Sequence, residues 1–114
     1  MDEHVVRAKG RYIRMAPRKV RIIADTIRSK RVDEASAILA FAPRRAVGPV
    51  KKVLESALDA ARKAGNFDLE NLMVREIYVD QGPTLKRGRS RARGMMTQIQ
   101  KKTSHITVVL GEAE

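Results

Sequence analysis

Residues 81–103 read QGPTLKRGRSRARGMMTQIQKKT, which contains seven Lys or Arg residues and no acidic residue. A strand is predicted on each side: residues 72–80 (LMVREIYVD), which alternate with a period of two, precede this stretch, and residues 104–110 (SHITVVL) follow it. A structureless loop of this length is uncommon within a compact domain. The sequence therefore predicts a long antiparallel hairpin over about 81–103, here called the arm, which joins two strands of a sheet.

The arm has almost no apolar side chains to bury, and its charges repel one another. At about 3.3 Å per residue, strands of ten residues would carry it roughly 30 Å beyond the core. A two-stranded ribbon alone is at best marginally stable in water. We therefore expect a polyanion that neutralises the arginines to order the arm. The alternative is a flexible, solvated basic loop.

The arginines of the arm are spaced by two, so in an extended chain they share one side: Arg87, Arg89, Arg91 and Arg93. The planar guanidinium group suits phosphate because it can donate two charge-assisted hydrogen bonds. The segment is not a nucleotide-binding loop, since it lacks the Gly-Lys-Ser/Thr ending and a following helix. This spacing favours contacts with the phosphates of a polyanion.

The positive charge of the 114-residue chain is unevenly distributed. There are 24 Lys and Arg against 13 Asp and Glu, which gives a net charge of +11. Residues 1–31 hold ten basic and three acidic residues, 32–80 hold seven and eight, and 81–114 hold seven and two. Two basic segments thus flank a neutral stretch, which favours two contact surfaces for a polyanion and excludes a calcium buffer.

The first basic segment predicts a strand followed by a helix. Residues 4–13 read as a strand with Arg7, Lys9 and Arg11 on one side. Pro17 opens a helix, because its missing N–H costs nothing at the first helical position. The apolar stripe of that helix is Val20, Ile23, Ala24 and Ile27, and the helix is expected to end at Ser29-Lys30-Arg31 with cations near its negative pole.

Two further helices are predicted in the neutral stretch. Asp33 is the expected N-cap of a short helix that ends before Pro43. A third helix ends at Ala64, before Gly65. If the third helix begins at Arg44, Pro49 should kink it, whereas a start at Gly48 places Pro49 at a favoured first position. The sequence leaves both starts open.

No set of residues in the sequence suggests catalysis, a metal or a cofactor. There is no Cys and there are two His. Ser104 and His105 are adjacent on a strand, so their side chains point to opposite faces and cannot form a nucleophile–base pair. Residues 1–20 contain six basic residues instead of the apolar core of a signal peptide. We expect a cytoplasmic, non-enzymatic protein without membrane or small-molecule partners.

Several blocks of sequence occur in the order typical of one family. They are MAPRKVR at 15–21, IR at 27–28, KVLESA at 52–57, DQGPTLKR at 80–87, RARG at 91–94 and KTSHITVV at 102–109. Over essentially its whole length the chain closely resembles the universal L-twenty-two family of large-subunit ribosomal proteins. The resemblance implies an α+β fold: three helices packed on a small antiparallel three-stranded sheet, with a long basic β-hairpin. Residues 1–114 would form one domain, with a globular part at 1–80 and 104–114.

The resemblance also implies a function. Members of that family bind large-subunit ribosomal RNA and support early subunit assembly. Their hairpin lines the nascent-polypeptide tunnel, close to large-subunit protein four and the nascent chain. Here the globular side would bind rRNA through Arg7, Lys9, Arg11, Arg14, Arg18, Lys19 and Arg21. The arm would bind it through Lys86, Arg87, Arg89, Arg91, Arg93, Lys101 and Lys102, and its tunnel-lining tip would be Lys86, Arg87, Gly88, Arg89, Ser90 and Arg91.

The chain departs from the family pattern at a few positions. Ala16 stands where Ser is frequent, Ser29 where Gly is usual, and Ala60 where Asn is frequent. Near the tip, Gly88-Arg89-Ser90 replaces apolar residues and Pro, and Met95-Met96 replaces basic or small residues. The alternative function is a DNA-binding regulator that uses the first two helices as a helix-turn-helix.

Overall fold

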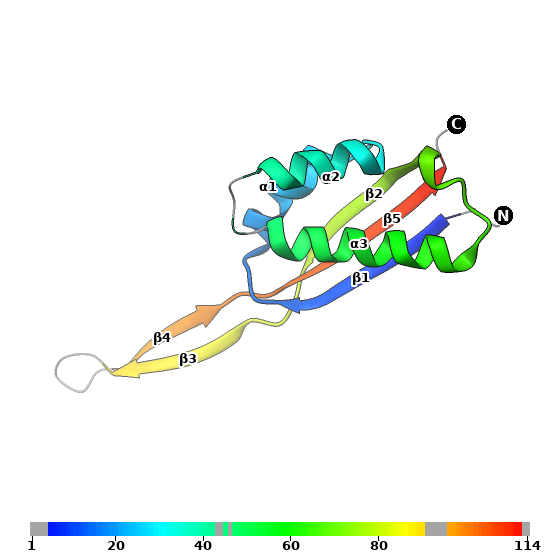
Figure 1. Ribbon diagram of the computed structural model, residues 1–114. Coiled ribbons are helices and arrows are strands. Elements are labelled where there is room, and N and C mark those ends of the chain that lie inside the picture. The colour runs from blue at the N-terminus through cyan, green and yellow to red at the C-terminus, as the bar shows by residue number, and fades with distance from the viewer. Residues whose placement is uncertain (1–4, 43–44, 46, 91–95, 113–114) are drawn as a thin grey trace.

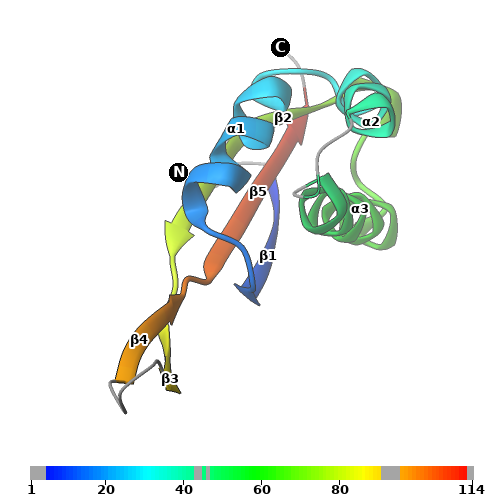
Figure 2. The same cartoon turned by 90° about the vertical axis from the view of Figure 1, so that its left-hand side faces the viewer.

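The computed structural model describes residues 5–42, 45, 47–90 and 96–112, with the backbone alone for residues 85–90 and 96–100. The fold class is α+β, as predicted (Figures 1 and 2). Three strands form an antiparallel sheet in the order β1-β5-β2: β1 is Val5–Ile13, β2 is Leu72–Gln81 and β5 is Ser104–Glu112. A short 3-10 helix, Leu69–Asn71, precedes β2.

Three helices pack against the sheet to enclose the core: α1 is Pro17–Ile27, α2 is Val32–Phe41 and α3 is Val47–Ala64. Helix α1 contacts β2, and α3 lies along β1 and β5 (Figure 1). The predicted α1 stripe is confirmed, because Val20, Ile23, Ala24 and Ile27 are all buried. Alternate residues of the central strand complete this core, namely Ile106, Val108 and Leu110.

Gly10 of β1 lies directly against α3. A Cβ atom at this position would lie 2.7 Å from Cγ2 of Val53, closer than atoms in van der Waals contact. The strand therefore carries glycine where the helix packs on it, although glycine weakens strands in isolation. Between Gly10 and Ile13 the register with β5 shifts, and Tyr12 adopts a left-handed backbone conformation with φ of 56°.

The end of α1 differs from the sequence prediction. The helix ends at Ile27, with no basic residue in its last turn, rather than at Ser29-Lys30-Arg31. Ser29 turns the chain with φ of 64°, and the following residues then pair with the edge of β2. The N–H of Ser29 donates to the carbonyl of Val74 at 3.0 Å, and the N–H of Val74 donates to the carbonyl of Lys30 at 2.8 Å. Pairing with a distant strand thus replaces the expected last helical turn.

The starts of the other two helices also differ from the predictions. Helix α2 begins at Val32, so its N-cap is Arg31 and Asp33 lies inside the first turn. That carboxylate lies near the positive end of the helix dipole without being the N-cap. Helix α3 begins at Val47, which places Pro49 in the first turn. The missing N–H of Pro49 would have had no intrahelical partner there, so it does not interrupt the helical hydrogen bonds.

Strand β2 contains a bulge that the strict alternation of its sequence did not reveal. Leu72 and Val74 are buried, then Arg75 and Glu76 are both exposed. After the bulge Ile77 and Val79 are buried. The register against β5 shifts between Val74 and Glu76. One extra residue therefore moves the inward face from even-numbered to odd-numbered positions.

The predicted hairpin is present as a separate two-stranded antiparallel sheet (Figure 1). Its strands are β3, Leu85–Ser90, and β4, Met96–Lys101, paired from Leu85↔Lys101 to Ser90↔Met96. The arm points away from the globular body, and the molecule measures 63 × 31 × 20 Å along its principal axes (Figures 1 and 2). Within the described residues, no helix has the length and apolarity needed to span a membrane.

Candidate RNA-binding surfaces

The predicted basic face of β1 is present. Arg7 and Lys9 lie opposite Val109 and Thr107 of β5, on the sheet face that points away from the helical core. The remaining members of the predicted globular surface, Arg11, Arg14, Arg18, Lys19 and Arg21, lie on β1, the β1–α1 connection and α1. All seven side chains are exposed, so each cation is accessible to a phosphate.

Charge divides the open face of the sheet into two sides. On the β1 side lie Arg7 and Lys9. On the β2 side lie Glu76, Tyr78 and Asp80, which pair with Val109, Thr107 and His105, together with exposed Arg75, whose side chain lies against Gly111. Arg7 and Lys9 give the first side two cations, whereas the second side carries two carboxylates and one guanidinium group, so phosphates favour the first side. The acidic side could not be read from residues 72–80 alone, because the bulge decides which residues face outward.

The middle strand of this face is covered by its neighbours. Val109 is 2% exposed and Thr107 is 6% exposed, although no helix lies over them. The longer side chains of β1 and β2 shield them, as expected for the centre of a three-stranded sheet. The hydroxyl oxygen of Thr107 is buried and has no hydrogen-bond partner among the described residues.

Arg21 of α1 and Arg28, the C-cap residue of that helix, bind the free edge of β2. Arg21 donates from Nε and Nη2 to the carbonyl oxygen of Val79, at 3.2 and 2.9 Å. Arg28 donates from Nη2 to the carbonyl oxygen of Ile77 at 2.9 Å and forms an ion pair with Asp25. Sequence reasoning assigned Arg21 to phosphate alone and missed this role. The one hint in the sequence is that Arg21 and Arg28 are seven residues apart, a spacing that places both side chains on the same side of a helix.

The two basic segments meet where the arm leaves the body. The backbone N–H of Tyr12 donates to Nδ1 of His105 at 3.1 Å, and the two rings meet edge to face with centroids 5.0 Å apart. Exposed cations of both segments flank this contact, namely Arg11, Arg14, Lys101 and Lys102. The two basic segments, which the sequence predicted as two contact surfaces, are therefore joined at the base of the arm.

The arm places its predicted residues along a strand. Lys86, Arg87 and Arg89 belong to β3, and Gly88 and Ser90 complete the same strand. These positions were expected at the tip, but the Ser90↔Met96 pair puts the connection between the two strands at 91–95. Arg91 and Arg93 fall in that connection and lie outside the described residues.

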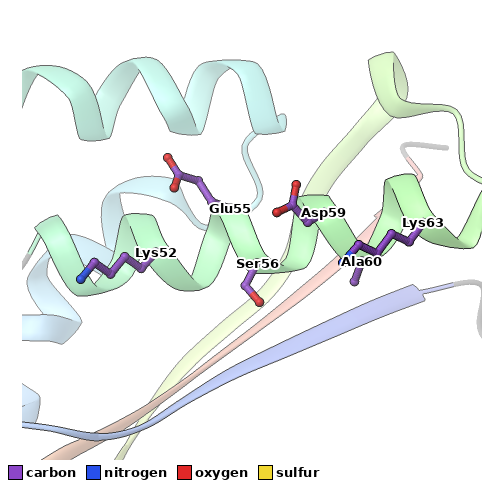
Figure 3. Close-up of a pocket in the computed structure, with 6 residues that line it drawn as sticks. All are labelled: Lys52, Glu55, Ser56, Asp59, Ala60 and Lys63. Carbon is purple, nitrogen blue, oxygen red and sulfur yellow. The ribbon is translucent and has the colours of Figure 1, made fainter.

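A shallow groove lies on the outer side of α3. It is lined by Lys52, Glu55, Ser56, Asp59, Ala60 and Lys63, all from that one helix (Figure 3). Its two lysines and two carboxylates balance, so it offers no net charge to a polyanion. In the described part of the chain, no group of three or more His, Cys, Asp or Glu could hold a metal ion.

Comparison with known proteins agrees with this arrangement. The family described as ribosomal protein L22p/L17e matches residues 8–111. Two proteins named large ribosomal subunit protein uL22, from Desulfitobacterium hafniense strains Y51 and DSM 10664 / DCB-2, are each 54% identical over 106 residues. That alignment covers 93% of this chain and 93% of each relative. The chain therefore belongs to the ribosomal protein L22p/L17e family, a structural family of non-enzymatic proteins.

Proposed function

We propose that the protein is a structural component of the large ribosomal subunit and binds large-subunit rRNA. One observation carries this proposal: exposed cations run along β1, cross to the start of α1 and reach the base of an arm that has no acidic residue. Folded RNA is the polyanion whose closely spaced phosphates match such an extended surface. The printed names of the relatives support the ribosomal location.

The globular cations would hold the body against RNA while the arm enters between RNA segments. The arm strands each contain six residues, which gives a length of roughly 20 Å at about 3.3 Å per residue. As a member of this family, the protein would support early subunit assembly and line the nascent-polypeptide tunnel. Its partners there would be protein four of the large subunit and the nascent chain, in the cytoplasm.

The structure gives little support to the alternative of a DNA-binding regulator. In a helix-turn-helix the second helix enters the major groove. Helix α2 would take that place, and its sequence VDEASAILAF contains two acidic residues and no Lys or Arg. DNA phosphates would repel exposed Asp33 and Glu34.

Binding to large-subunit rRNA tests the proposal directly. The purified protein should co-sediment with a transcript of bacterial large-subunit rRNA and protect defined nucleotides from chemical modification. Its affinity should fall steeply with salt, by roughly 0.7–0.9 log units per neutralised phosphate for each log unit of salt. Equal affinity for duplex DNA of the same length, or no change in affinity with salt, would contradict the proposal.

A further inference from the structure

The base of the arm is a break in the sheet. Gln81 pairs with Ser104, and the next pair toward the tip is Leu85 with Lys101. The β2–β3 side therefore covers four residue steps where the β4–β5 side covers three. An extra residue on one strand bends an antiparallel ladder and interrupts its hydrogen bonds. A ribbon attached by two such links would be free to pivot unless other contacts held it.

Three consecutive residues supply those contacts, and each binds a different segment. The Thr103 hydroxyl donates to the carbonyl oxygen of Pro83 at 2.6 Å. The Ser104 hydroxyl donates to the carbonyl oxygen of Met15 at 2.6 Å. Nδ1 of His105 accepts the N–H of Tyr12 at 3.1 Å. The β2–β3 link, the connection between β1 and α1, and the end of β1 are thereby tied to one short stretch of chain.

Two of these contacts involve buried hydroxyl groups. Thr103 is 3% exposed and Ser104 is 0% exposed, and their bonds are partly buried, whereas the Tyr12–His105 bond is exposed. Breaking either hydroxyl bond would leave a buried hydroxyl group without a partner, which costs more than the bond itself contributes. The Thr103 and Ser104 bonds therefore stabilise the junction more than a surface pair would.

Gly82 closes the same junction by backbone packing. Its N–H donates to the carbonyl oxygen of Thr103 at 2.9 Å. A Cβ at Gly82 would lie 2.5 Å from Oγ1 of Thr103 and 3.2 Å from Cε1 of His105. Any side chain at position 82 would displace both residues, so the two links can pack this closely only with glycine.

We propose that Thr103, Ser104 and His105 are positioning residues that fix the direction in which the arm leaves the body before RNA is bound. The arm strands carry few apolar groups, but their direction is set by buried contacts of the globular part. A fixed direction lowers the entropy that must be lost when the arm enters RNA. The benefit for RNA binding rests on the proposed function, whereas the fixed direction is a property of the free protein.

A distance measurement in the free, full-length protein tests the fixed direction. The chain has no native Cys, so Ser56→Cys on α3 and Gln100→Cys near the base of β4 place two spin labels specifically. Double electron–electron resonance should give one narrow distance distribution. Adding Thr103→Val and Ser104→Ala should broaden it about twofold or more, because a ribbon held only by its links can pivot.

The matched control is Thr26→Val, which also removes a 2.6 Å bond from a hydroxyl to a carbonyl, that of Ile23, but within α1. It should leave the distribution unchanged. His105→Phe provides a second variant that keeps an aromatic ring beside Tyr12 and removes the acceptor. A broad distribution in the parent protein, or parent width in both His105→Phe and the Thr103/Ser104 variant, would overturn the proposal.

RNA binding separates positioning from direct contact. With the rRNA transcript, the Thr103/Ser104 variant should bind about tenfold more weakly, since ordering the arm is then part of the binding cost. Its salt dependence should match that of the parent protein, because no phosphate contact has been removed. A reduced salt slope would instead mean that cation–phosphate contacts are lost, which contradicts a role limited to positioning the arm. If the parent protein fails to bind rRNA, the proposed function is wrong while the spin-label result still decides the fixed direction.

Discussion

Arg21 donates two hydrogen bonds to the carbonyl oxygen of Val79, 58 residues further along the chain. The guanidinium group thereby closes part of the free edge of β2, while the side chain as a whole stays exposed. The same side chain can thus serve the fold in the free protein and RNA in the complex. A substitution of Arg21 should therefore change both the stability of the free protein and its affinity for rRNA.

We expect Arg21→Lys to lower the free energy of unfolding by about 1 kcal/mol, because an ammonium group cannot donate two bonds to one carbonyl in this geometry. The partial exposure of the side chain keeps the effect small. Urea denaturation measures the change, with exposed Arg18→Lys as the control that should leave stability unaltered. If stability is unchanged while rRNA affinity falls, Arg21 acts on RNA alone.

Thr107 offers a stabilising substitution. Its hydroxyl is buried without a hydrogen bond, and valine has nearly the same shape. Thr107→Val should raise the free energy of unfolding by about 1 kcal/mol, since it removes an unsatisfied polar group. The urea midpoint should rise.

The matched control for Thr107→Val is Thr103→Val. That change breaks the bond to the carbonyl of Pro83 and should lower the midpoint instead. A fall in the midpoint for both variants would mean that the Thr107 hydroxyl has a partner in solution.

A second stabilising substitution is expected at Ser29. Its φ of 64° lies in the left-handed region, which costs L-residues energy and glycine little. Ser29→Gly should therefore stabilise the protein by about 0.5–1 kcal/mol. Ser36→Gly, on the exposed side of α2, is the control and should destabilise it by a similar amount. Thermal unfolding of both variants checks the opposite signs.

The elements that could be predicted from sequence depend on local patterns. The strand-like segments 72–80 and 104–110 and the lack of acids over 81–103 predicted the sheet strands and the arm. The stripe from Val20 to Ile27 predicted the buried face of α1. In each case the signal lies within a single helix, strand or connecting segment.

The features that were missed depend on contacts between distant segments. The early end of α1 follows from pairing of Ser29 and Lys30 with Val74. The hydrogen bond from Ser104 to Met15 joins residues 89 positions apart, and it cannot be predicted from the types of the two residues. Likewise, the bulge at Arg75 decides which side chains of β2 form the acidic side of the open face. No period in a single segment encodes such partners.

The uneven distribution of charge over the surface predicts which lysines contact RNA phosphates. Lys9 and Lys19 lie on the proposed RNA-binding surface, whereas Lys52 and Lys63 lie beside Glu55 and Asp59 in the groove of α3. Changing each pair to Gln removes the same charge from exposed positions. The Lys9/Lys19 variant should lower the slope of log affinity against log salt by about 1.5, from roughly 0.7–0.9 per lost phosphate contact.

The Lys52/Lys63 variant should leave that slope within error of the parent, because its lysines would contact no phosphate. Filter binding to the rRNA transcript over a range of salt concentrations measures both slopes under one set of conditions. Equal reductions in the two variants would mean that net charge alone governs binding, in which case RNA is not held at a particular face. A reduction confined to Lys9 and Lys19 assigns the phosphates to the β1 side of the sheet and the start of α1.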